Sequence, residues 1–383
     1  MATTDKKEIV DRGLEKYRSR MVGALIRPKI GNEVATRDAI RHFANGTGDH
    51  NPLWLDEDYA KRGIHRGIIA PPFFLTAVSE GQAIIGLPGL VSTFVGAEWE
   101  WHRVIRVDDR FTVSNRLLEL EDKGGPDGRR RFLQSGILSY VNQRQETVGT
   151  CTWHMMRTER KLGGGEKGRR REKDSGIRIH RYSDEELEAI CSAVEAEEIR
   201  GAAPRWYETV AVGDELVPVV KGPLSLSDMV AWAIGAAWHR IALAHGPKLL
   251  HLRSKPGLSY KDPETGAPEP ISLSHFHPAA AEILMGSPLP LDLGFQRICW
   301  FGHLVTNWMS DHGFLRKLNA RLEAFVRFGD TNWCRGKIVK KWVDGKDHLV
   351  EMELHSENQR GEITMTGNAV VALPSKENSE PER

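Results

Sequence analysis

The feature that most constrains the fold of this chain is an internal duplication. The segment RVDDRFTVSN, which begins at Arg106, resembles RFGDTNWCRG, which begins at Arg327, 221 positions further along. The segment NQRQETVGT from Asn142 similarly matches NQRGEITMT from Asn358. A repeat of this length exceeds a solenoid unit and indicates a duplicated domain rather than an array.

Each copy has the same order of elements. A helical stretch comes first, and alternating β-branched runs separated by Gly or polar residues follow, which predicts consecutive antiparallel strands. With 383 residues, the chain also exceeds what one hydrophobic core usually organises. The sequence therefore predicts two α+β domains.

Charge and glycine mark the junction between the copies. Residues 157–175, RTERKLGGGEKGRRREKDS, are too polar to be ordered by burial, and their basic cluster is typical of a solvated tether or a contact to a polyanion. Ser183 followed by Glu186 forms a capping-box pattern and predicts a helix. We divide the chain into an N-terminal domain (1–156), a basic linker and helix (157–200), a C-terminal domain (201–375) and a disordered tail (376–383).

The second copy carries an insertion. Upstream of the strands, Asp38 aligns with Asp228 at a separation of only 190 residues, so the second copy holds about 31 extra residues near 246–270. This segment is rich in Pro and Gly and predicts a loop. Its role stays open.

Composition excludes several functional classes. Lys and Arg total 53 against 52 for Asp and Glu, so no global charge attracts nucleic acid or an anionic membrane. Neither a signal peptide nor an apolar span of about 20 residues is present, which predicts a cytoplasmic protein. The four cysteines have neither disulfide nor zinc-ribbon spacing, and His275 and His277 lack further ligands nearby, so we expect no metal.

The most specific motif is GDHNPLWLD, from Gly48 to Asp56, followed by IIAPPFF around Pro71. It resembles the hydratase motif G-D-x-N-P-[LI]-H-x-D of the MaoC-like and (R)-specific enoyl-CoA hydratase families. The whole chain resembles a fused MaoC dehydratase with an N-terminal part similar to fungal fatty-acid-synthase dehydratases. The resemblance implies acyl-thioester substrates and a double hotdog: two hotdog domains in one chain, each an antiparallel sheet wrapped around a long helix.

In that family, the Asp and a His five positions later jointly activate water, because a carboxylate and an imidazole can exchange a proton near neutral pH. Asp49 and Asn51 match the motif, but Trp54 occupies the position of the His. Trp cannot accept a proton, so the first copy lacks the usual pair. Asp49 and Asn51 could instead serve only to cap the following turn.

The second copy supplies a histidine. His275 aligns with Trp54, but Pro270 stands where the Asp would be. A partner for His275 must then come from elsewhere, and His239 is the first choice because it aligns with Asp49. The other candidates are His245, Glu269 and Asp292. A structural alternative for His275 is the start of a helix, since Pro278 follows it.

Four further residues are candidates for substrate binding besides Trp54. Pro71 and Gly294 precede or open helical turns whose N–H groups could hold a thioester oxygen, although plain turn geometry explains them too. Asp292 aligns with Pro71. Arg103 could bind a CoA phosphate or lie on a strand edge.

Together these features predict an acyl-CoA hydratase or dehydratase, a hydro-lyase with one working site between the halves. CoA would enter as part of the substrate, with no separate cofactor, and a homodimer of such chains is one assembly that the fold allows. Two alternatives stay open: a non-catalytic acyl-CoA-binding protein, and a hotdog enzyme of altered chemistry such as thioester hydrolysis.

Overall fold

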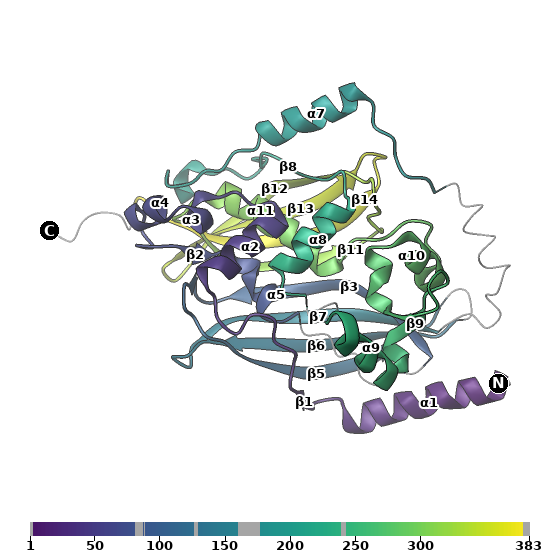
Figure 1. The fold of residues 1–383 in the computed structure, drawn as a ribbon. Coiled ribbons are helices and arrows are strands. Elements are labelled where there is room, and N and C mark those ends of the chain that lie inside the picture. Colours follow the sequence, from purple (N-terminus) through teal and green to yellow (C-terminus); the bar gives the residue numbers. More distant parts are fainter. Residues whose placement is uncertain are drawn as a thin grey trace.

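The two halves of the chain build one continuous sheet. The computed structural model describes residues 3–80, 87, 89–125, 129–159, 177–238 and 243–377. Within these residues, ten strands pair in the antiparallel order β1-β5-β6-β7-β3-β11-β14-β13-β12-β8 (Figure 1). The strand order of the second half mirrors that of the first, which confirms the duplication and the double hotdog.

The elements of each half follow the same plan. The first half comprises α1 (Thr3–Arg20), β1 (Leu25–Ile26), α2 (Arg37–Thr47), α3 (Pro52–Leu55), α4 (Glu57–Arg62), β2 (Ile69–Ala70), η1 (Pro72–Phe74), α5 (Leu75–Val78), β3 (Leu90–Trp101), β4 (Ile105–Arg106), β5 (Thr112–Asp122), β6 (Arg131–Val141) and β7 (Thr147–Glu159). The second comprises α7 (Asp184–Glu195), η2 (Tyr207–Thr209), β8 (Val219–Lys221), α8 (Leu226–Gly235), α9 (His245–Ser254), η4 (Pro256–Leu258), β9 (Ser259–Lys261), β10 (Pro268–Pro270), η5 (Ile271–His275), α10 (Pro278–Met285), α11 (Gly294–Met309), β11 (Phe314–Leu322), β12 (Asn332–Asp344), β13 (Asp347–Asn358) and β14 (Ile363–Leu373).

The halves join where β3 pairs with β11. The pairing runs from Glu100 opposite Lys317 to Gly96 opposite Arg321. A Cβ on Gly96 would lie 2.4 Å from the carbonyl oxygen of Ala320, so this close approach requires glycine. Lys317 Nζ also lies 2.6 Å from a carboxylate oxygen of Glu100. One sheet therefore runs through both domains without an edge between them.

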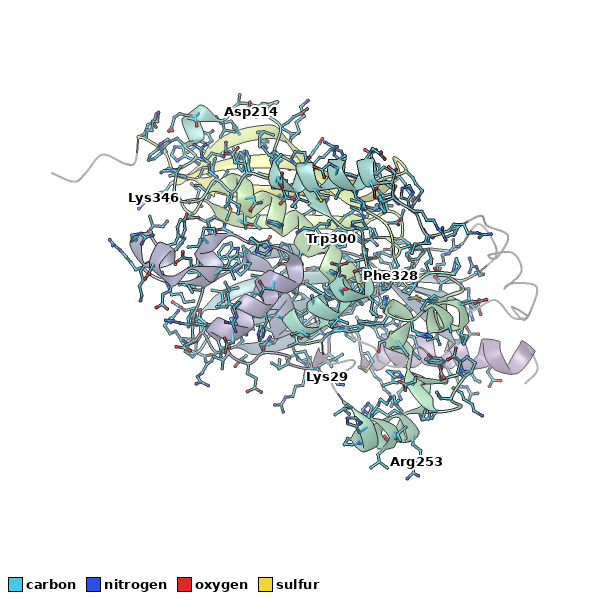
Figure 2. The ribbon with its side chains drawn as sticks, turned by 45° about the horizontal axis from the view of Figure 1, so that its top comes forward. Lys29, Asp214, Arg253, Trp300, Phe328 and Lys346 are labelled. Atoms are coloured by element: carbon cyan, nitrogen blue, oxygen red, sulfur yellow. The ribbon has the colours of Figure 1, made fainter. Side chains whose placement is uncertain are left out.

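Helix α11 occupies the core of the second half. Every residue from Phe295 to Met309 is buried, and the helix packs on β3, β11, β12 and β14. Trp300 of this helix lies toward the middle of the molecule (Figure 2). A helix buried on all sides exposes no face to solvent, so a polar side chain on it must find its partners inside the protein.

A second contact between the halves is the crossing of α2 and α8. A Cβ on Gly46 would lie 2.7 Å from the oxygen of Ala231, and one on Gly235 would lie 2.4 Å from the oxygen of His42. These glycines let the two helix backbones touch. The pair of helices matches the predicted alignment of Asp38 with Asp228, since each Asp lies in the first turn of its helix.

The repeated sequence segments form matched turns. Asp109 Oδ2 accepts a hydrogen bond from the backbone N–H three residues earlier at 2.8 Å, and Asp330 does the same at 2.9 Å. Asn142 and Asn358 each accept from the backbone N–H groups two and four residues later. The duplicated residues thus maintain local structure, which explains why they are easy to find in the sequence.

Three sequence predictions concern the connections. The capping box of Ser183 and Glu186 is confirmed at the start of α7. Most of the predicted linker, residues 160–176, lies outside the described residues, and β7 extends into its first residues, to Glu159. At the C-terminus, Ser375 and the backbone of Lys376 bind Glu208, so the ordered chain continues slightly past the predicted boundary.

The predicted loop at 246–270 is wrong in part, because the insertion has structure of its own. It forms α9, η4 and a hairpin of β9 and β10, in which Asp262 accepts hydrogen bonds from the turn residues Glu264 and Thr265. Arg253 on α9 lies at the outer edge of the molecule (Figure 2).

None of the helices that the structure describes combines the length and the apolar composition that a membrane span requires.

Candidate active site

Asp49 and Asn51 lie in the short connection between α2 and α3. Gly48 ends α2 in the left-handed conformation (φ 65°), and the next residue, Asp49, is buried. Asp49 Oδ1 accepts a hydrogen bond from the backbone N–H of Asn51 at 3.1 Å, and Asn51 caps α3 through Leu53 N–H at 3.0 Å. The predicted capping role is therefore present, and it holds the Asp49 carboxyl in place.

The imidazole nearest to Asp49 comes from the other half of the chain. His303 lies in the middle of α11, is 4% exposed, and places Nε2 3.8 Å from Asp49 Oδ1. Neither residue can reach solvent without movement of the core. The structure thus brings together a carboxyl group and an imidazole, although not the pair that the sequence predicted.

Lys221 at the end of β8 holds this pair. Its Nζ lies 2.7 Å from His303 Nδ1 and donates to the carbonyl oxygens of Thr47 and Gly48 at 2.8 and 3.2 Å. An ammonium group only donates, so Nδ1 accepts and the ring proton resides on Nε2, which faces Asp49 and the side-chain amide of Asn307. For Nε2–H to donate to Asn307, the amide oxygen of Asn307 has to be the atom turned toward the ring. Lys221 therefore sets the tautomer of His303 and ties it to the end of α2.

Burial shifts the protonation equilibria of all three side chains. It raises the pKa of Asp49 to about 6, and the Asn51 N–H and the Lys221 charge offset only part of this rise. Burial, with a smaller contribution from Lys221, holds the pKa of His303 well below its usual 6.5. Burial also lowers the pKa of Lys221. Near neutral pH, Asp49 is a carboxylate close to its protonation point, beside a neutral imidazole.

The raised pKa makes Asp49 a cost to stability at neutral pH. Its folded-state pKa of about 6 exceeds the usual 3.8, so its contribution to stability falls as pH rises from about 4 to 6. We expect Asp49→Asn to raise the free energy of unfolding at pH 7 by roughly 2–3 kcal/mol, and the gain to disappear below pH 4. Urea unfolding at pH 3.5 to 7.5 measures this, and a pH-independent difference would contradict it.

A cavity adjoins Asn51 and Trp54, the residues that contact the Asp49 carboxyl group. Its volume is about 30 Å³, room for one or two water molecules. It lies between α3, β2 and β4 of the first half and the end of α11 with the start of β11. Its lining comprises Asn51, Leu53, Trp54, His65, Ile69, Ala70, Pro72, Trp101, Arg103, Val104, Ile105, Thr306, Met309, Ser310, Asp311, Gly313, Phe314 and Leu315. Asp49 and His303 do not line the cavity themselves, but Asp49 contacts the lining residues Asn51 and Trp54, and His303 lies one helical turn before the lining residue Thr306.

Trp54 fills the position where the motif has its histidine. The side chain is 2% exposed and lines the cavity, and its indole N–H has no hydrogen-bond partner at normal geometry among the described residues. It is nevertheless close enough to Asp49 to lower the pKa of that carboxyl slightly. Trp54 thus orients a donor toward the carboxylate but cannot take up a proton.

An open basic cleft adjoins the cavity. It holds about 340 Å³ and is lined by His102, Arg103, Val104, Arg106, Arg144, Phe314 and Arg316. Arg103, Val104 and Phe314 line both spaces, so the cleft and the cavity meet at these three residues. The predicted substrate residue Arg103 therefore stands at the junction, half exposed and 3.1 Å from Glu146.

The other predicted site residues lie elsewhere. His275 Nδ1 is 3.0 and 3.1 Å from the carbonyl oxygens of Leu291 and Asp292, just before α11 begins. His303 lies nine residues into that helix, about 13 Å along its axis from Gly294. The structure therefore does not bring His275 to Asp49. His239 lies outside the described residues.

Asp292, Gly294 and Pro71 have structural roles at helix starts. Asp292 forms a buried two-bond ion pair with Arg297. A Cβ on Gly294 would lie 2.4 Å from the ring of Phe94, and Pro71 immediately precedes η1. Within the described residues, no group of three His, Cys, Asp or Glu side chains is placed to hold a metal ion.

A signal for His303 exists in the sequence. Thr306 and Asn307 lie three and four positions after His303 in a stretch, 298–309, that is otherwise apolar, so the three side chains share one face of the helix. All three are buried, and Asn307 lies 3.1 Å from His303 Nε2. A polar stripe on a buried helix indicates an internal polar site. Nothing in the sequence connects this stripe to Asp49.

Comparison with known proteins supports the family expected from the motif. The sequence profile of the FAS1-like dehydratase domain region matches residues 20–151. A UPF0336 protein of Streptomyces coelicolor is 32% identical over 114 residues, which cover 28% of this chain and 75% of that protein. A probable enoyl-CoA hydratase alpha subunit of Thermomonospora curvata is 25% identical over 170 residues, 39% of this chain. That match spans about half (52%) of the relative's own length.

Solved structures show the same fold over nearly the whole chain. A MaoC-like dehydratase superposes with a TM-score of 0.61 at 18% identity, covering 94% of this chain and 99% of the other. A conserved hypothetical protein of Mycobacterium tuberculosis, described as having a double hotdog fold, gives 0.55 at 12% identity, with 93% and 97% covered. From its sequence relatives and its two fused hotdog domains, we conclude that this chain belongs to the MaoC-like dehydratase family.

Proposed function

We propose that this chain adds water to an α,β-unsaturated acyl thioester, or removes it in the reverse direction. The observation that carries the proposal is the Asp49 carboxylate, with a pKa of about 6, 3.8 Å from the neutral imidazole of His303 behind the cavity wall. A base with a pKa near the working pH is the kind that general acid–base catalysis favours.

The pair can perform the proton transfers of hydration. Asp49 takes a proton from a water molecule whose oxygen bonds to Cβ, while His303 Nε2–H helps to orient that water. The proton on Asp49 then passes to Cα, which completes the addition and restores the carboxylate. To reach Asp49 from the cavity, substrate must move Asn51 and Trp54, since both residues line the cavity and contact the Asp49 carboxyl group.

The basic cleft supports CoA as the carrier of the acyl group. A guanidinium group can donate two parallel hydrogen bonds to the oxygens of one phosphate, and four arginines line the cleft. A CoA ester with its phosphates in this cleft would direct its thioester through the junction at Arg103 into the cavity. CoA would then be part of the substrate, with no separate cofactor.

Replacement of Arg103 tests this orientation. We expect Arg103→Ala to raise KM for an enoyl-CoA ester roughly tenfold, because charge-assisted hydrogen bonds to phosphate are lost. The same variant should leave KM for the matching pantetheine ester, which lacks the phosphates, unchanged. Arg335→Ala, an exposed arginine on β12, is the control. Equal changes for both esters would place the CoA phosphates elsewhere.

The activity itself is tested with a panel of enoyl-CoA esters of short, branched, aromatic and steroid-sized acyl groups. Loss of the conjugated thioester absorbance and release of free thiol are followed together. Absorbance loss without thiol demonstrates hydration, whereas thiol release demonstrates hydrolysis. No change with any ester would refute the proposed enzyme.

Two observations favour a second candidate, a non-catalytic acyl-CoA-binding protein. Trp54 stands where the family motif has its proton-accepting histidine, and the cavity holds only about 30 Å³. In that case the protein would bind saturated and unsaturated CoA esters equally well and transform neither. Calorimetric titration with both kinds of ester separates this candidate from the hydratase.

A further inference from the structure

One residue that lines the cavity, Asp311, has a buried carboxyl oxygen with no hydrogen-bond partner among the described residues. Asp311, in the turn between α11 and β11, is 4% exposed and lines the cavity. Its Oδ2 accepts a hydrogen bond from the Tyr59 hydroxyl at 2.7 Å. Its Oδ1 is buried and has no hydrogen-bond partner among the described residues. A buried acceptor without a hydrogen bond lowers the stability of the protein, so we expect a donor from a ligand to bind this oxygen.

The surrounding contacts prevent Asp311 from turning away. Its backbone N–H donates to the oxygen of Gly201 at 2.9 Å, and its carbonyl oxygen lies 3.0 Å from His65 Nε2. Tyr59 holds the carboxyl group itself, and burial with Asp311 as neighbour raises the pKa of Tyr59 to about 12, so the hydroxyl remains a donor. Two segments of the chain thus hold the backbone of Asp311, and Tyr59 holds its carboxyl group.

The place of Asp311 in the cavity lining limits which group of a ligand can donate a hydrogen bond to its Oδ1. The lining of the cavity is largely apolar, with Asn51 and Trp54 at the wall before Asp49 and with Arg103 and Phe314 at the junction to the cleft. Asp311 lies three residues before Phe314, which lines both the cavity and the cleft. A ligand with its phosphates in the cleft and its thioester near Asp49 would pass its connecting arm through the cavity that Asp311 lines.

We propose that Asp311 Oδ1 accepts a hydrogen bond from the pantetheine arm of the acyl thioester, and that Tyr59 is the residue that positions it. The arm is the part of a CoA ester between phosphate and sulfur, and it offers amide N–H and hydroxyl donors. This inference rests on the proposed acyl-thioester substrate.

The test compares thioesters that lose the arm stepwise. Dissociation constants are measured for one saturated acyl group carried on CoA, pantetheine, N-acetylcysteamine and ethanethiol, of which the last has no donor. Asp311→Leu should weaken binding of the CoA and pantetheine esters about tenfold and leave the ethanethiol ester unchanged. Asp311→Asn keeps an oxygen as acceptor for the Tyr59 hydroxyl but turns N–H donors toward the arm, so it should weaken the same two esters while it preserves the contact to Tyr59.

The controls separate contact from structure. Asp58→Asn removes a carboxylate from an exposed position next to Tyr59 and should bind every ester as the wild type does. Equal weakening for all four esters by Asp311→Leu, or no weakening for any, would overturn the inference. Because binding needs no turnover, a protein that binds CoA esters without hydrating them refutes the proposed reaction and still decides the role of Asp311. A wild-type protein that binds no CoA ester overturns both.

Discussion

His303→Ala should lower the rate of enoyl-thioester hydration at least a hundredfold while CoA esters still bind. The imidazole is the group closest to the Asp49 carboxylate across the two halves, and removal of a general acid–base or water-orienting group typically costs a factor of about 100 to 10,000. Single-turnover absorbance measurements separate this loss from a loss of binding. Asp49→Asn should cause a comparable loss.

The same pair predicts the pH profile. Asp49 must be a carboxylate to accept a proton, so kcat should rise with pH through a midpoint near 6. His303 stays neutral over this range, because burial holds its pKa well below 6.5. A rate that does not change between pH 5 and 7 would exclude Asp49 as the base.

His275→Ala provides the discriminating comparison, since the sequence predicted His275 as the catalytic histidine. From its place against the carbonyls of Leu291 and Asp292, we expect this variant to change turnover by less than a few fold. Loss of activity in His275→Ala with full activity in His303→Ala would return the catalytic role to His275.

Asp292→Ala should destabilise the fold by about 3–5 kcal/mol without a specific effect on substrate binding. Both side chains of the Asp292–Arg297 ion pair are 2% exposed, and the oxygens of Asp292 lie 2.5 and 2.7 Å from the guanidinium of Arg297. Arg297 also donates to the carbonyl oxygens of Ala324 and Thr364. Removing the acid leaves a buried charge unpaired, which is what makes the change severe.

Urea unfolding measures this loss, and a second variant tests the cause. The double change Asp292→Leu with Arg297→Met removes both charges and should recover a large part of the stability, because no buried charge is left alone. A loss below about 1 kcal/mol for Asp292→Ala would contradict the argument. A large rise in KM at unchanged stability would support the predicted role of Asp292 in substrate binding.

The duplication made the fold predictable. The turns around Asp109 and Asp330 form the same local hydrogen bond, and this bond requires the same residues at the same spacing in both copies. Asp49 and Asn51 were found through their motif. His303 and Lys221 were missed, since they meet Asp49 through tertiary packing over long separations in the chain. The insertion was underestimated because Pro and Gly can also bound a short helix and hairpin.

Joining the halves through β3 and β11 changes how such a site can evolve. In a symmetric pair of separate subunits, every substitution appears twice, so a tryptophan at the histidine position would alter both sites at once. In one polypeptide the two copies mutate independently. Trp54 could therefore arise in the first copy while α11 of the second copy supplied the His303 imidazole to Asp49.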